Sequence, residues 1–231
     1  LAKRTYFAIA LQIYGAMLSV YWSAQFIPSG WISVIFGLTP FITALLSAFW
    51  LGEKSLGRKN LFAYALGLSG LVIMFHNALQ ISTHSFLAII GVLFAVCLQS
   101  FSAVWVKRLH CQLPTITQVT GGLLFSVPCY IITWYFLDGQ LPTSLPLKSI
   151  GSILYLGLIA TPIGFALYYY VLTHLAATRV ALITLITPVL ALMLGYYINQ
   201  ENLTANIIIG SGLILSALFI HIFSTSRKPK K

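Results

Sequence analysis

Two stretches decide the fold of this chain: residues 39–55, TPFITALLSAFWLGEKS, and residues 187–203, TPVLALMLGYYINQENL. Each begins with Thr-Pro, continues as an apolar run and reaches a glutamate, Glu53 or Glu201, thirteen residues after its proline. An aromatic pair precedes both Thr-Pro pairs by the same distance. The two stretches therefore read as two copies of one unit.

The composition around these stretches indicates a membrane protein. Of 231 residues, 59% are hydrophobic and only 7% are charged, and the mean hydropathy is +0.93. A soluble domain carries about 25% charged residues. Because so few charges cannot cover a water-facing surface, we expect an all-α protein whose apolar side chains face a lipid bilayer.

Apolar segments long enough to cross the bilayer occur eight times. A membrane-spanning helix needs about 20 mostly apolar residues, whereas a barrel strand needs about 9–11 residues of alternating polarity. The length of the segments therefore predicts transmembrane helices. The predicted spans are residues 5–27, 30–51, 60–79, 86–106, 116–137, 150–172, 180–198 and 203–223.

Basic residues give these spans an orientation. On the eight-span interpretation, twelve basic residues lie on one side of the membrane and only Lys148 lies on the other. The twelve are Lys3, Arg4, Lys54, Arg58, Lys59, Lys107, Arg108, Arg179, Arg227, Lys228, Lys230 and Lys231. The positive-inside rule places the side with these twelve residues, together with both termini and the basic tail 226–231, in the cytoplasm. The net charge of +10 is thus interpreted as a topology signal in the cell membrane rather than as a nucleic-acid surface.

The two copies are expected to run in opposite directions. They are offset by 148 residues, and that offset contains five predicted spans, an odd number. Residues 86–225 then form a complete five-helix repeat, and residues 1–79 form the last three helices of an inverted one. By the same symmetry we expect two further spans before Leu1, ten in total. Many secondary transporters are built from inverted repeats with a substrate site near the midplane.

Several segments resemble the EamA-type transporters of the drug/metabolite transporter superfamily. The stretch from residue 39, followed by NLFAYALGLSGLVIMF at 60–75, is similar to the end of an EamA repeat, as is the stretch from residue 187 with GSGLILSALFI at 210–220. The segment FLAIIGVLFAVCLQSFSAVWVKRL at 86–109 resembles the helix that opens the second repeat. The resemblance implies inverted repeats around a central cavity and export of metabolites, amino acids or drugs.

Polar and aromatic residues inside the spans are the candidates for the substrate path. Gln99 is the strongest candidate, because a buried amide without a partner is costly. The other candidates are Thr39, Thr187, Thr161, Tyr14, Trp22 and Tyr168. Each has a structural alternative: the threonine hydroxyls can bond their own helix backbone, Tyr14 can pack between helices, and Trp22 and Tyr168 can anchor at the headgroups.

Other features predict structural roles. Pro40, Pro128, Pro162 and Pro188 lie near mid-span, as kinks or as breaks in a cavity wall. Glu53 and Glu201 match the family's Pro…Glu pattern and precede a helix N-terminus, where a carboxylate is stabilising. Asp138 is expected in a loop and the five histidines at span ends. The three cysteines have no metal-ligand spacing.

The sequence as a whole predicts a transporter and not an enzyme. No hydrolase or phosphate-loop motif is present, and we expect no cofactor or metal. The predicted partners are the lipid bilayer and a small organic substrate, exported by alternating access of the two repeats. Two alternatives stay open: a nucleotide-sugar or sugar-phosphate carrier, which needs basic residues in its cavity, and a truncated membrane protein that does not transport.

Overall fold

The computed structural model describes residues 1–52, 57–75, 83–137, 139–140, 146–177 and 204–226, together with 180, 190, 193–194 and 196–198. In these residues every regular element is a helix, so the all-α prediction is confirmed for the described part of the chain. Glu53, Asp138, Thr187, Pro188 and Glu201 lie outside the described residues.

The first predicted span is one helix with a widened middle turn. It consists of α1 (Ala2–Ala10), the π-helical segment η1 (Leu11–Ala16) and α2 (Met17–Ser23). The second predicted span is two helices, α3 (Ser29–Phe36) and α4 (Thr39–Leu51). The break between them falls immediately before Pro40, whose ring cannot follow a regular helical turn without a clash.

The later spans agree with the predicted segments. They are α5 (Arg58–Phe75), α6 (Thr83–Leu109), α7 (Thr115–Leu137) and a long helix made of α8 (Leu147–Tyr155), η3 (Leu156–Ala160) and α9 (Thr161–His174). The last described helix is α12 (Ala205–Ser226). The span predicted at 180–198 lies mostly outside the described residues.

Four helical segments in the described part of the chain are long and apolar enough to cross a membrane. They are Ser29–Leu51, His84–Leu109, Thr115–Leu137 and Ser149–His174. Two shorter apolar helical segments lie in α5 and α12. The structure thus agrees with a multi-pass membrane protein, whereas the count of eight spans stays a prediction.

Proline accounts for two of the helix irregularities. Pro162 is the second residue after the π segment η3, as Pro40 is the second residue after the break between α3 and α4. A proline lacks the N–H that an α-helix needs and crowds the carbonyl four residues before it, so the preceding turn opens. Pro128, by contrast, lies inside α7 without ending it.

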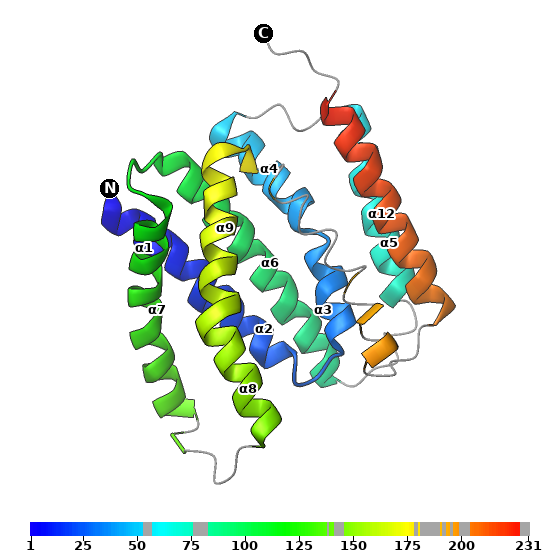
Figure 1. Ribbon diagram of the computed structural model, residues 1–231. Coiled ribbons are helices and arrows are strands. Elements are labelled where there is room, and N and C mark those ends of the chain that lie inside the picture. The colour runs from blue at the N-terminus through cyan, green and yellow to red at the C-terminus, as the bar shows by residue number, and fades with distance from the viewer. Residues whose placement is uncertain are drawn as a thin grey trace.

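Helix α6 is the centre of the larger group of helices, and α5 pairs with α12. Along its length α6 contacts α1, η1, α2, α3 and α4. Helices α5 and α12 lie side by side at one edge of the molecule (Figure 1). At their crossing, a Cβ atom on Gly70 would lie 2.6 Å from the carbonyl oxygen of Gly210. Only glycine allows the two backbones to come this close.

Replacing Gly70 should therefore loosen the α5–α12 pair. We expect Gly70→Ala to lower the free energy of unfolding by about 1–3 kcal/mol, because the added methyl group meets backbone that cannot rotate away. The matched control is Gly212→Ala on α12, where a Cβ would meet no atom within 4 Å. Thermal unfolding in detergent compares the two variants, and equal melting temperatures would contradict the packing described here.

Candidate substrate path

Three helices meet at a buried set of neutral hydrogen bonds, which we call the central polar cluster and define as Gln12, Ser102 and Tyr169. The Tyr169 hydroxyl donates to Oε1 of Gln12 at 2.8 Å and lies 3.3 Å from Oγ of Ser102. Ser102 Oγ in turn donates to the carbonyl of Ala8 at 2.7 Å. The cluster thus ties α9 and α6 to helix α1–η1–α2.

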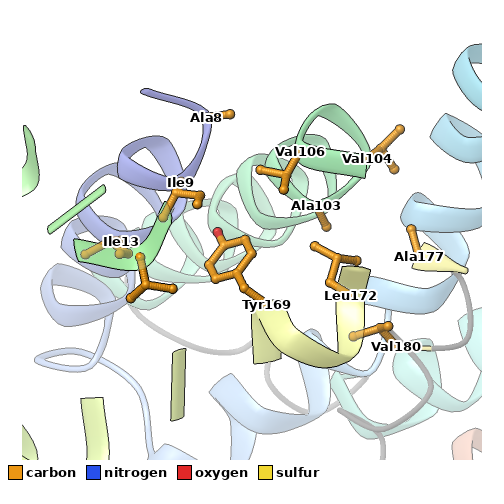
Figure 2. Packing of buried hydrophobic residues seen from close by; sticks show 11 residues of the cluster. Ala8, Ile9, Ile13, Ala103, Val104, Val106, Tyr169, Leu172, Ala177 and Val180 are labelled. Atoms are coloured by element: carbon orange, nitrogen blue, oxygen red, sulfur yellow. The ribbon is translucent and has the colours of Figure 1, made fainter. Parts of the chain in front are cut away.

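Buried apolar side chains pack around this cluster. Figure 2 shows Tyr169 between Ile9 and Ile13 of the first helix and Ala103 of α6. Tyr169 and Ser102 are fully buried and Gln12 is 3% exposed. In such surroundings a hydroxyl or amide without a partner is costly, so the three side chains depend on one another.

Gln99, the strongest candidate from the sequence, lies one turn before Ser102 on α6. It is buried, and its side chain is hydrogen-bonded to Tyr168. Tyr168 packs edge-on against Tyr169, with ring centroids 5.1 Å apart. The structure therefore brings two predicted candidates, Gln99 and Tyr168, together beside the central polar cluster.

Tyr14 belongs to a second contact, between η1 and α7. Its hydroxyl lies 2.5 Å from Oγ1 of Thr133, and its ring meets that of Tyr130 edge-on with centroids 5.1 Å apart. The Tyr130 hydroxyl donates to the carbonyl of Ile13 at 2.6 Å. Tyr14 is thus a packing and hydrogen-bonding residue between two helices, which agrees with its structural alternative.

The remaining described candidates lie apart from the central polar cluster. Thr39 is buried, and its hydroxyl donates to the carbonyl of Phe36, the last residue of α3, at 2.6 Å. Trp22 is 42% exposed near the end of α2, against Phe26. Thr161 is half-buried at the start of α9. Among the described residues, no hydrogen bond joins any of these three to the cluster.

Lys107 caps the C-terminal end of α9. Its ammonium group donates to the carbonyls of Leu172, Thr173 and Leu175 at 3.0, 3.2 and 2.8 Å. The last carbonyls of a helix have no partner within it and carry partial negative charge, so a cation there is stabilising. A cavity of about 140 Å³ lies beside this contact, away from the central polar cluster. Its lining is Val106, Lys107, His110, Cys111, Gln112, Gln118, Leu172 and Thr173.

The sequence reasoning missed Gln12, Ser102, Tyr130 and Thr133 as site residues. Gln12 carried the signal that selected Gln99, a side-chain amide inside a predicted span. The others carried little signal, because serine, threonine and tyrosine are common in membrane helices and bond their own backbone readily. Their importance depends on which helices are neighbours.

Removing one hydroxyl from the central polar cluster should weaken the fold. We expect Tyr169→Phe to lower the free energy of unfolding by about 1–3 kcal/mol, because Gln12 then keeps a buried oxygen without its donor. The control is Tyr170→Phe, one residue along, whose side chain is 55% exposed. Urea or thermal unfolding in detergent measures both, and a Tyr169→Phe variant as stable as its control would count against the cluster.

Comparison with known proteins assigns this fold to a family. The model of the EamA-like transporter family matches residues 86–223, more than half of the chain. An uncharacterised transporter from Bacillus subtilis, YoaV, is 26% identical over 93% of this chain and 73% of its own length. An uncharacterised transporter from Archaeoglobus fulgidus is 30% identical over 84% of this chain and 68% of its own length.

Two further comparisons concern a relative named as an efflux pump and a solved structure. A probable amino-acid metabolite efflux pump from Escherichia coli is 26% identical over 85% of this chain and 68% of its own length. One solved crystal structure superposes with a TM-score of 0.71 at 16% identity, over 96% of this chain and 77% of the other. The matched family and the relatives' names are those of transporters and not of enzymes. On these grounds the chain belongs to the EamA-like transporter family.

Proposed function

We propose that this protein exports small polar organic metabolites, amino acids among them, across the cell membrane by alternating access of two inverted repeats. The observation that carries the proposal is the family match over 86–223, together with the buried central polar cluster at the meeting point of α1–η1–α2, α6 and α9. The name of the Escherichia coli relative, a probable amino-acid metabolite efflux pump, supports both the cargo and the direction.

The arrangement of α5 and α12 supports the inverted repeat. These helices are equivalent under the offset of 148 residues, and they cross antiparallel: Gly70 faces Gly210, while Gly67 faces Ala217. Two equivalent helices that pack in opposite directions are what an inverted pair requires. The third helix of each proposed repeat also carries a π segment, η1 or η3.

The chemistry of the path favours a neutral or zwitterionic cargo. Gln12, Gln99 and Ser102 offer amide and hydroxyl groups, and Tyr168 and Tyr169 offer phenols with apolar faces. Such groups bind hydroxyl, amide or carboxylate groups of a small molecule one hydrogen bond at a time. A carrier of sugar phosphates needs cationic groups along its path, and the cation Lys107 is engaged at the end of α9.

The remaining candidates extend the path on the same proposal. Thr39 and Thr187 are equivalent positions under the repeat, as are Pro40 and Pro188. Thr39 presents its carbonyl to Ser100 at 3.5 Å, and Ser100 accepts from Thr43 at 3.0 Å. This polar contact joins α4 to α6. It would let a moving substrate exchange partners along α6.

Gln99 gives the direct test of the function. We expect cells that express the protein to release amino acids loaded as dipeptides faster than empty cells do. Gln99→Leu, which keeps the volume and removes the amide, should slow that release about tenfold, as expected for the loss of one or two hydrogen bonds to substrate. The control is Gln112→Leu, an exposed residue after α6. Release is measured by chromatography at equal amounts of membrane-inserted protein.

Two results would contradict the proposal. If cells with the protein release none of the twenty amino acids faster than empty cells do, amino acids are not the cargo. If the Gln99→Leu and Gln112→Leu variants release amino acids at the same rate, Gln99 is not part of the path, although transport itself stands.

Cysteine labelling tests the proposed orientation. In a background without Cys97 and Cys129, Cys111 in the connection after α6 should resist a membrane-impermeant maleimide in whole cells and react after the membrane is opened. Gln140→Cys, placed in a Cys111→Ser version of that background, should react in whole cells, because the connection after α7 is proposed to face outward. The reverse pattern would place the termini outside.

A further inference from the structure

In the π segment of the first helix, the N–H of Met17 bypasses the carbonyl of Ile13. In an α-helix the N–H of Met17 donates to the carbonyl four residues before it, which is that of Ile13. Here the N–H of Met17 reaches the carbonyls of Gln12 and Tyr14 instead. The Ile13 carbonyl thus loses its usual α-helical donor and is open to a donor from another helix.

Tyr130 supplies that donor from α7. Its hydroxyl lies 2.6 Å from the Ile13 carbonyl, and its ring packs edge-on against Tyr14. The contact of Tyr14 with Thr133 lies one turn further along α7. Two side chains of α7, one turn apart, therefore contact η1. One of them, Tyr130, donates a hydrogen bond to the Ile13 carbonyl.

The π segment controls where the side chains of the first helix point. One residue of α-helix turns the chain by about 100°. If η1 returned to α geometry, the part of the helix after it would rotate by about that angle relative to the part before it. Gln12 and Tyr14 lie within η1 itself, so a return to α geometry would change the directions of both side chains relative to α2 and disturb their contacts with Tyr169 and Thr133.

We infer that Tyr130 is a positioning residue for transport, whose hydroxyl holds η1 in its π form and thereby orients Gln12 in the substrate path while Tyr14 stays packed against α7. Without this hydroxyl the Ile13 carbonyl loses its bond to α7, and the backbone of η1 opens more readily. The inference rests on the proposed transport function for its kinetic consequence, while its structural content stands on the hydrogen bonds of η1 alone.

Tyr130→Phe tests this inference, because it removes one oxygen and keeps the ring against Tyr14. Hydrogen exchange followed by mass spectrometry on protein in detergent or nanodiscs reads the amides of residues 11–18. We expect these amides to exchange about three- to tenfold faster than in the unchanged protein, the range that one lost hydrogen bond allows. The matched control is Tyr135→Phe on the same helix, whose side chain is 71% exposed and should leave the exchange unchanged.

A kinetic readout separates positioning from simple loss of folded protein. In the release assay, Tyr130→Phe should raise the half-saturating substrate concentration about three- to tenfold, whereas a merely destabilised protein would lower the maximal rate alone. Thr133→Val, which removes the second contact of α7 with η1, should raise the same amide exchange and serves if Tyr130→Phe does not fold.

The outcomes distinguish the two proposals. Unchanged exchange over residues 11–18 in both folded variants would overturn the role of Tyr130 and leave the transport function standing. Faster exchange with an unaltered half-saturating concentration would overturn the positioning role and leave only a structural one. Faster exchange in a protein that releases no amino acid would refute the proposed cargo, and with it the kinetic part of the inference.

Discussion

Every backbone carbonyl and amide that lipid surrounds must find its partner inside the protein, and the rest of this structure depends on that constraint. A straight α-helix meets it without help. The long helices of this chain are interrupted at η1, at η3 and before Pro40, and an interruption frees backbone groups. At η1 and in the turn before it, side chains of other helices bond the backbone: Ser102 donates to the Ala8 carbonyl and Tyr130 to that of Ile13.

The contacts that join the helices are neutral hydrogen bonds, and this suits a transporter. Each such bond between membrane helices contributes about 0.6 kcal/mol on average, and about 1.7 kcal/mol at most. A group of several such bonds holds one arrangement firmly, yet no single one is too strong to exchange. A buried ion pair would be much harder to separate, because each charge left alone in the interior costs several kcal/mol. The cation Lys107 is placed at a helix end, where three carbonyls receive it.

The sequence could predict what depends on length, composition and spacing. Apolar runs of span length predicted membrane helices, and the repeated Thr-Pro…Glu pattern led to a family that the comparison then established. It could also predict Gln99, because an amide in a long apolar helix needs a partner. That partner, Tyr168, lies about seventy residues away in the chain. Its contact with Gln99 follows only from the packing of α9 on α6.

The π segment η1 marks the limit of such reasoning. Residues 11–16, LQIYGA, contain no proline, and nothing in their spacing distinguishes a π turn from an α turn. The side chains that contact η1 and the turn before it are Tyr130 and Thr133 on α7, Ser102 on α6 and Tyr169 on α9. Because these residues come from three later helices, a local pattern could not reveal η1 or the central polar cluster built on it.

The coupling between Gln12 and Tyr169 tests most directly whether neutral hydrogen bonds join the first helix to the later ones. A double-mutant cycle of Gln12→Leu and Tyr169→Phe, measured by unfolding in detergent, isolates this pair from the changes each substitution makes alone. The account predicts a coupling free energy of about 0.5–2 kcal/mol, because the second substitution removes a bond that the first has already broken. If the free-energy changes of the two substitutions add strictly, the buried hydrogen bond between Gln12 and Tyr169 does not stabilise the fold, and the account is contradicted.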